Sequence, residues 1–258
     1  MPFPNYPEKH NLPAVLTAQD LLAYRRQLGR FPDIEPPEGM ILCLQKGLPE
    51  RLRRRHPLKQ VGNLMGDLYL LKQSRGKVGV LSNFGIGAPL IAALTEELVA
   101  WGVKRFISMS WAGGLQPNLS PGAIVACSRA IRDEGTSHHY LPANKYVLAD
   151  PELVENLMHA LARQDHKYSE GTTWTTDAPY RETRDEILQY QAEGVLVVEM
   201  ETAALLAVGQ VRGVQTCAVC VVGDSLAELR WKAPLDVRIV ERGLETVYAG
   251  AISVLMDM

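Results

Sequence analysis

The segment "VVEMETAALLAVGQVRGVQTCAVCVVGDS" (residues 197–225) decides the fold expected of this chain. A short apolar run, apolar residues at helical spacing and a second apolar run follow one another, so the segment predicts a strand–helix–strand unit. Glu199 ends the first predicted strand, Glu201 begins the helix and Asp224 ends the second strand. Because such a unit brings both strand ends to one edge of a sheet, we expect Glu201 and Asp224 to line one pocket.

The same alternation extends over the rest of the chain. Apolar runs typical of buried strands occupy residues 39–47, 76–87, 103–115, 122–135 and 168–177, and helical patterns occupy residues 18–29, 48–55, 88–102, 151–164, 183–194 and 238–258. Strands that alternate with helices predict an α/β fold, a single domain with a central mixed β-sheet flanked by helices. We expect residues 1–38 to form an N-terminal arm with one helix, and residues 39–258 to form the α/β domain.

Composition argues against several classes of function. The 258 residues are 47% hydrophobic and 22% charged, and their formal net charge is −2. This balance gives no basic surface for nucleic acid. The chain has no apolar stretch of the roughly 18 to 20 residues that a membrane span needs, and its first residues lack the apolar core of a secretion signal. We therefore expect a cytoplasmic protein without nucleic-acid or membrane partners.

No metal site is expected. Cys217 and Cys220 form a C-x-x-C pattern, but it lies inside an apolar strand pattern, which favours buried structural thiols over redox or metal chemistry. His138 and His139, with Asp133, are the other candidate ligands for zinc. Adjacent histidines on one loop seldom reach the same ion.

Two carboxylates at one pocket suggest cleavage of a glycosidic bond. One acid can protonate the leaving group, while the other, as an anion, binds hydroxyl groups near the developing positive charge. A second interpretation stays open at this point. Carboxylates near a helix N-terminus interact favourably with the helix dipole, and both Glu199 and Asp224 precede residues that could start a helix.

The segment of residues 197–225 also resembles the signature of the nucleoside phosphorylase-I family. This family includes uridine phosphorylases, hexameric purine nucleoside phosphorylases and methylthioadenosine nucleosidases, whose members read V-E-M-E-x-A before a helix and a strand. Further stretches similar to the family motifs are "GLPERL" (47–52), "NFGIGAP" (83–89), "SWAGGLQPNLSPGAIV" (110–125), "DEGTSHHYLP" (133–142) and "TTDAPY" (175–180). The resemblance covers residues 39–256, and the motifs occur in the family's order.

The resemblance implies which residues bind the ribose. Glu201 would accept hydrogen bonds from the 2′- and 3′-hydroxyl groups, and Met200 would pack on the sugar. Glu199 would flank the same pocket. His10 is similar to an N-terminal histidine that reaches the sugar bound by a neighbouring subunit, so the resemblance also implies a homo-oligomer, a dimer or a trimer of dimers.

The resemblance assigns the base to a second group of residues. Asp224 would be the catalytic acid that protonates or hydrogen-bonds the leaving base, since a neutral base leaves more readily than its anion. Tyr180, Pro179 and Val198 would face the base. Asp224 favours a purine, whereas "DEGTSHHYLP" is closest to uridine phosphorylases. Those enzymes bind uracil with a Gln-x-Arg pair, for which "YRETR" (180–184) has arginines but no glutamine.

The phosphate site matches the family only in part. The residues that the resemblance assigns to phosphate are Gly47, Arg51, Gly87 and Ser110. A second arginine is usual before the G-T-x-G turn, where this chain has Ser108, and Trp111 replaces the phosphate-binding Thr or Ser of the turn. Each charge-assisted hydrogen bond to phosphate is worth about 1.5–3 kcal/mol, so missing arginines weaken such a site.

The activity that the resemblance implies is phosphorolysis. A nucleoside and phosphate would give free base and ribose 1-phosphate, with phosphate as co-substrate and no cofactor. Two alternatives stay open. Water could be the nucleophile, because "WAGGL" resembles the "SAGGL" of the nucleosidase branch, or the chain could bind a nucleoside without cleaving it.

Overall fold

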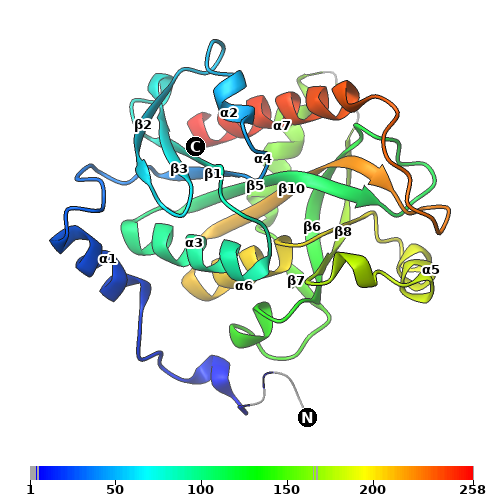
Figure 1. Cartoon of the computed structure of the whole chain (residues 1–258), viewed down its shortest axis with the longest axis horizontal. Helices are drawn as coiled ribbons and strands as arrows, with labels where there is room; N and C mark the ends of the chain where they lie inside the picture. The colour runs from blue at the N-terminus through cyan, green and yellow to red at the C-terminus, as the bar shows by residue number, and fades with distance from the viewer. Residues whose placement is uncertain (1–3, 5, 165, 167, 258) are drawn as a thin grey trace.

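The segment of residues 197–225 folds as the expected unit of β9 (Val197–Glu199), α6 (Thr202–Arg212) and β10 (Gln215–Ser225). The computed structural model describes residues 4, 6–164, 166 and 168–257 (Figure 1). The other strands are β1 (Gly39–Cys43), β2 (Leu58–Asn63), β3 (Asp67–Leu71), β4 (Val78–Ser82), β5 (Arg105–Gly114), β6 (Ile124–Asp133), β7 (Tyr146–Leu148) and β8 (Tyr168–Thr176). The other α-helices are α1 (Ala18–Gln27), α2 (Leu48–Arg51), α3 (Ala88–Trp101), α4 (Pro151–Ala162), α5 (Arg184–Ala192) and α7 (Val237–Asp257), and the 3₁₀ turns are η1 (Lys9–Asn11), η2 (Lys72–Ser74), η3 (Ser137–His139) and η4 (Pro179–Arg181).

The described strands form one ten-stranded mixed sheet that curls onto itself. Its order is β10-β6-β8-β9-β5-β1-β4-β3-β2, with β7 paired to β6. Strands β4, β1, β5 and β10 are parallel neighbours, as the alternation of strands and helices requires, because parallel strands need crossover connections. A further pairing of β10 with β5 closes β10, β6, β8, β9 and β5 into a ring. The expected mixed α/β sheet is confirmed.

Backbone pairing in this ring gathers the acidic residues of the segment. Asp224 lies opposite Gly113 in the β5–β10 pair, and Gly113 lies opposite Val198 in the β5–β9 pair. On the other side of β9, Thr175 of β8 lies opposite Glu199. One edge of the ring therefore carries the ends of β5, β8, β9 and β10, where a ligand site is expected.

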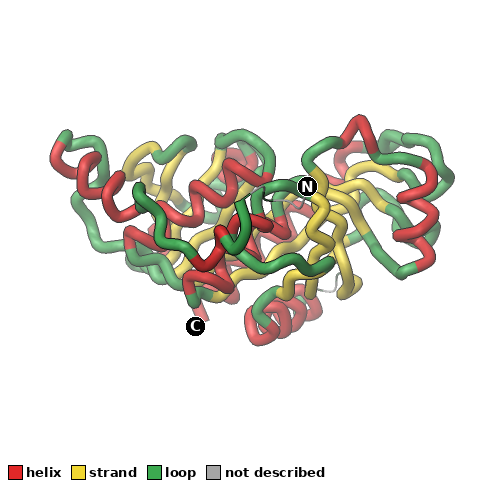
Figure 2. The backbone as a smooth tube through the Cα atoms, turned by 90° about the horizontal axis from the view of Figure 1, so that it is seen from below, coloured by secondary structure: helices red, strands yellow, loops and turns green. Residues whose placement is uncertain are grey.

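Helices cover both faces of the sheet (Figures 1 and 2). α3 packs against α6 on one face, and α4 packs against α7 on the other. α7 is long enough to cross β10, β5, β1 and β4. It can do so because Val240, Leu244, Val247 and Ala251 recur at helical spacing and are buried, which gives the helix one apolar stripe.

α5 packs beside the edge of the sheet where Glu199 and Asp224 lie, at the end of the molecule opposite α1 (Figure 1). Ile187 of α5 joins Trp174 of β8 and Val198 of β9 in one apolar cluster. At its start, Thr183 and Glu186 form a capping box, in which each side chain accepts from the other residue's backbone N–H. These contacts hold the segment before α5 beside the ends of the strands.

The structure contains elements that the sequence did not predict, shortens one predicted helix, and decides one alternative that the sequence left open. The hairpin of β2 and β3 and the short strand β7 were not expected. In β2 only Leu58 is buried, so this strand carries no apolar pattern, whereas β3 buries Leu68, Tyr69 and Leu71. The predicted helix at 48–55 is a single turn that ends at Arg51. No helix starts at Asp224, since β10 runs to Ser225 and a turn follows. Within the described part of the chain, none of the helices combines the length and apolar character required for a membrane span.

Candidate active site

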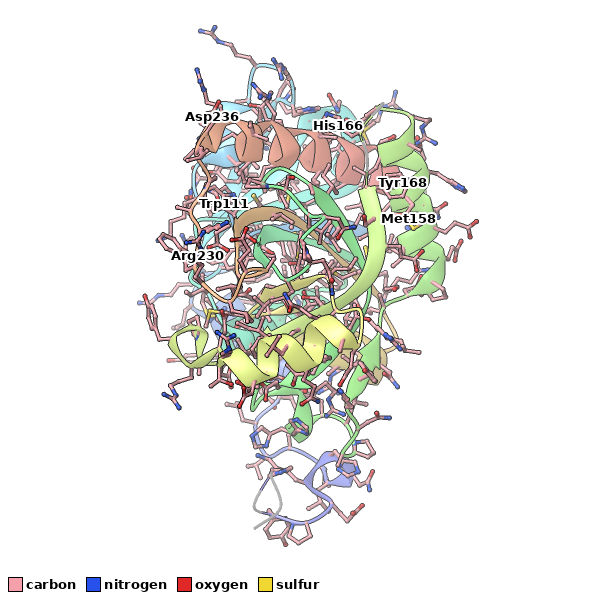
Figure 3. All side chains as sticks on the ribbon, turned by 90° about the vertical axis from the view of Figure 1, so that its right-hand side faces the viewer. Trp111, Met158, His166, Tyr168, Arg230 and Asp236 are labelled. Carbon is pink, nitrogen blue, oxygen red and sulfur yellow. The ribbon has the colours of Figure 1, made fainter. Side chains whose placement is uncertain are left out.

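A cavity of about 770 Å³ opens where β5, β9 and β10 end. Its walls come from these strand ends, from the segment of η4 and α5, and from the loop that follows β10. The lining residues are Trp111, Ala112, Gly113, Pro179, Tyr180, Glu182, Arg184, Ile187, Val198, Glu199, Met200, Gly223, Asp224, Leu226, Leu229, Arg230 and Trp231. Figure 3 shows Trp111 and Arg230 on the same side of the molecule, away from Met158 and Tyr168.

The indole of Trp111 forms an apolar surface of this cavity. It packs on the backbone of Gly223, where an added Cβ would lie 2.9 Å from the ring. Any larger residue at position 223 would therefore push the indole away. Trp111 is 38% exposed and is one of the residues that line the cavity. A flat, partly exposed aromatic ring is a suitable stacking surface for a planar base.

Asp224 is held inside the cavity by the strands and by Trp231. The register of β10 shifts between Val222 and Asp224, and this irregularity places Asp224 opposite Gly113. Its Oδ2 accepts a hydrogen bond of 2.9 Å from the indole N–H of Trp231. Its Oδ1 lies over Gly113, where an added Cβ would be 3.0 Å away. Asp224 therefore lies within β10, where it contacts Gly113 of β5 and Trp231 of the following loop, and it does not cap a helix.

Glu199 is a buried carboxylate with protein donors on both oxygens. Its Oε1 accepts from the hydroxyl groups of Thr175 at 2.6 Å and Thr173 at 3.2 Å. Its Oε2 accepts from the backbone N–H groups of Glu201 at 2.8 Å and Thr202 at 2.7 Å. Burial raises the pKa of Glu199, although these hydrogen bonds oppose the rise. Glu199 thus caps the start of α6 and fixes the backbone of Glu201, as well as lining the cavity.

Glu201 is buried and lies next to Glu199. Its Oε1 accepts from the backbone N–H of Gly87 at 2.6 Å, and its Oε2 accepts from the backbone N–H of Met200 at 3.2 Å. Burial, and then the charge of Glu199, raise the pKa of Glu201 to about 7. Within the described residues no cation pairs with this carboxyl group, so its remaining lone pairs are suited to hydroxyl donors of a ligand.

The pKa of Glu201 predicts how stability depends on pH. Its folded pKa of about 7 lies above the ordinary 4.5, so the folded state holds a proton that the unfolded state releases between these values. The contribution of Glu201 is therefore fully present below pH 4.5 and is lost as the pH rises through 7, by on the order of 3 kcal/mol. Denaturant unfolding at pH 4.5 and 8 measures this. Relative to Glu201→Gln, the wild type should lose that amount of unfolding free energy between the two pH values. An unchanged difference would contradict the assignment.

On the side of η4 and α5, the cavity contains a carboxyl group that is not among the expected site residues. Glu182 lies between η4 and α5, lines the cavity and is partly buried. Burial, followed by the charges of Asp224 and Glu186, raises the pKa of Glu182 to about 7. A signal was present in the sequence: Glu182 and Arg184 form a Glu-x-Arg pair in the stretch where a Gln-x-Arg pair was sought.

Most of the residues expected at the base and sugar line one cavity, but Glu201, expected to share a pocket with Asp224, is not among its lining residues, and its oxygens accept the backbone N–H groups of Gly87 and Met200. Val198, Glu199, Met200 and Asp224 line the cavity from the strand ends, and Pro179 and Tyr180 line it from η4. Tyr180 is 99% exposed, so it lies at the rim of the cavity. His10 lies elsewhere, in η1, which packs against η3 of the same chain. Its Nε2 is 3.7 Å from Glu8.

The four residues expected at phosphate have protein partners in this structure. The backbone N–H of Gly47 donates to Asn83 Oδ1 at 3.1 Å, and the N–H of Gly87 donates to Glu201. Arg51 forms an exposed ion pair of 2.9 Å with Glu241 of α7. The hydroxyl of Ser110 lies 3.6 Å from Cys220 Sγ. Among the described residues that line the cavity, none of these four occurs.

The structure gives no sign of a metal centre in the residues it describes. These residues contain no group of three or more His, Cys, Asp and Glu side chains that could hold an ion. Cys217 and Cys220 are both buried in β10 as free thiols, as expected from the apolar strand pattern.

Comparison with known proteins agrees with this fold. Residues 48–243 match the family model of the phosphorylase superfamily. The chain is 34% identical to uridine phosphorylase of Treponema pallidum over 201 residues, 73% of this chain and 78% of that protein. It is 27% identical to guanosine phosphorylase of Halorubrum lacusprofundi over 233 residues, 85% and 94% of the two chains. The crystal structure of AMP nucleosidase from Bacteroides thetaiotaomicron has the same fold, with a TM-score of 0.74 at 21% identity over 93% of this chain and 99% of that one. The resemblance noted in the sequence is confirmed: this chain belongs to the phosphorylase superfamily.

Proposed function

We propose that this protein cleaves the N-glycosidic bond of purine nucleosides with phosphate, giving free base and ribose 1-phosphate. The observation that carries the proposal is the position of Asp224, a carboxyl group that accepts a hydrogen bond from Trp231 in a cavity also lined by the partly exposed Trp111. An acid beside a stacking surface is what protonation of a leaving purine requires. Relatives named guanosine phosphorylase and uridine phosphorylase support phosphorolysis.

In the proposed reaction, Trp111 stacks on the base and Glu201 accepts hydrogen bonds from the ribose hydroxyl groups. As the bond between C1′ and the base nitrogen breaks, its electron pair moves to the base and Asp224 supplies the proton. A phosphate oxygen forms the new bond to C1′. The anionic Glu201 stabilises the positive charge that develops on the sugar between these events.

Phosphate binding requires Arg51 to exchange its partner. An exposed ion pair such as Arg51–Glu241 is worth about 0–1 kcal/mol. A charge-assisted hydrogen bond to phosphate is worth about 1.5–3 kcal/mol, so phosphate can compete for the guanidinium. Gly47 at the start of α2 would contribute its backbone N–H to the same anion.

Hydrolysis is the second candidate, and one observation favours it. The N–H groups of Gly47 and Gly87, two of the donors assigned to phosphate, already donate to Asn83 and Glu201. The bond from Gly87 is short, at 2.6 Å, and lies in a buried region. If neither donor is released, water is the nucleophile in the same cavity.

The identity of the second product separates these candidates. Purified protein is incubated with guanosine, inosine, adenosine and uridine in phosphate-free buffer, with and without added phosphate, and products are followed by chromatography and ³¹P NMR. We expect base release to require phosphate and a ribose 1-phosphate signal to appear. Base and free ribose formed equally well without phosphate would establish hydrolysis and overturn phosphorolysis.

Arg51 and Arg55 provide a matched comparison within this experiment. Both form exposed ion pairs with α7, to Glu241 and Glu245 respectively. We expect Arg51→Ala to raise the KM for phosphate by about 10- to 100-fold, the loss of one charge-assisted hydrogen bond. Arg55→Ala should leave it unchanged, because only Arg51 belongs to the phosphate motif.

A further inference from the structure

Glu182 and Arg184 form a second polar feature of the cavity, separate from the acid and the sugar site. They flank Thr183 at the start of α5, and both line the cavity. The backbone at Glu182 and Thr183 is extended, with ψ angles of 96° and 155°. In extended backbone, residues two apart lie on the same side. Thr183, between them, uses its side chain in the capping box, so the Glu182 carboxyl group and the Arg184 guanidinium both face the cavity.

The carboxyl group of Glu182 has acceptor capacity that the protein does not use. Within the described residues, no hydrogen bond or ion pair to Glu182 is found, whereas Glu199 and Glu201 both accept backbone N–H groups. Its acidic neighbours are Asp224 and Glu186, and neither forms a hydrogen bond with it among the described residues. A partly buried carboxyl group gains from donors, so a ligand that supplies N–H groups at this wall would be favoured.

We infer that Glu182 and Arg184 select 2-amino-6-oxopurines, with Glu182 accepting from the N1–H and 2-amino groups and Arg184 donating to O6. The inference rests on the proposed cleavage of purine nucleosides in this cavity. The two donors of a guanine edge lie side by side, which matches the two oxygens of one carboxylate in a bidentate contact. Arg184 has only donors, and the 6-oxo group is an acceptor.

Other bases fit this pair less well. Hypoxanthine keeps N1–H and O6 but lacks the 2-amino group, so one carboxylate oxygen loses its donor. Adenine places the N1 lone pair against the carboxylate and an amino group against the guanidinium, which mismatches both contacts. Sites built on hydrogen bonds discriminate against analogues that leave a polar group unpaired. The expected order of preference is therefore guanosine, inosine, adenosine.

The test compares Glu182→Gln with Asp185→Asn, an exposed acid in the first turn of the same helix. For each protein, kcat/KM is measured for guanosine, inosine and adenosine. In the wild type, guanosine should exceed inosine by about 10-fold and adenosine by about 100-fold. Glu182→Gln should reduce the guanosine-to-adenosine ratio by about 100-fold, because the amide replaces an acceptor by a donor. Asp185→Asn should leave the ratio unchanged.

A second measurement keeps the inference separate from the proposed reaction. Binding of 9-methylguanine, 9-methylhypoxanthine and 9-methyladenine, which have no sugar to cleave, is followed by tryptophan fluorescence from Trp111 and Trp231 at the cavity. Selective binding of 9-methylguanine that is lost in Glu182→Gln supports the inference even if no nucleoside is cleaved. Equal effects of Glu182→Gln on all three bases, or a wild-type preference for adenine, would overturn it, whatever the activity.

Discussion

Asp224→Asn is expected to lower kcat for nucleoside cleavage by about 10²- to 10⁴-fold, the usual contribution of a positioned general acid. The amide has nearly the size of the carboxyl group, and its oxygen can still accept from the indole N–H of Trp231. It has no acidic proton for the departing base. The loss should therefore fall on turnover, while the dissociation constant of the nucleoside changes little.

The matched control for this variant is Asp236→Asn. Asp236 lies before α7 and hydrogen-bonds Arg238, outside the cavity, so its amide variant should keep full activity (Figure 3). Pre-steady-state base release and equilibrium binding separate the two effects in each variant. If Asp224→Asn kept its turnover, or lost affinity and turnover in the same proportion, Asp224 would not be the acid.

Glu201→Gln is expected to reduce kcat/KM for ribonucleosides by about 10²- to 10⁴-fold. The carboxylate would accept two hydrogen bonds from the sugar, each worth about 1.5–3 kcal/mol when the acceptor is charged. The sum of about 3–6 kcal/mol corresponds to two to four factors of ten. In the free protein both oxygens already accept backbone N–H groups, from Gly87 and Met200. The amide can satisfy only one of these donors, so it also disturbs the local backbone.

Deoxynucleosides separate the sugar contact from that disturbance. A 2′-deoxynucleoside lacks one of the two hydroxyl groups, so the penalty of Glu201→Gln should be about 10- to 100-fold smaller with this substrate. A general loss of structure would instead reduce activity equally with both sugars. Equal penalties for the ribo and deoxy substrates would thus contradict a contact between Glu201 and the 2′-hydroxyl.

The strand–helix–strand unit could be predicted because its information is local. The apolar runs around Glu199 and Asp224 predict β9, α6 and β10. The two acids meet at one edge because β9 pairs antiparallel and β10 parallel with β5, both opposite Gly113, and the sequence alone did not reveal this arrangement. That Glu199 would cap the start of α6 was also one of the two interpretations of the sequence, and in the structure it both caps α6 and lines the cavity. Thr173 and Thr175, which complete its hydrogen bonds, come from β8, and their proximity depends on strand register that no local pattern encodes.

Other features depend on contacts between distant segments. The ring closed by β10 and β5 joins strands about a hundred residues apart, and in the hairpin of β2 and β3 only Leu58 of β2 is buried, so β2 carries no apolar pattern. The ion pair of Arg51 with Glu241 arises because α2 lies beside α7. The Glu-x-Arg pair of Glu182 and Arg184 is visible in the sequence, but only the structure shows that Glu182 is partly buried beside Asp224, which raises its pKa.

The most direct test of the central claim is a crystal structure with a C-nucleoside analogue of guanosine, whose glycosidic carbon–carbon bond resists cleavage. The account predicts the base stacked on Trp111 with its imidazole edge at Asp224, and the sugar hydroxyl groups within hydrogen-bond distance of Glu201. A nucleoside bound elsewhere, or bound with its base away from Asp224, would contradict the assignment of this cavity as the active site.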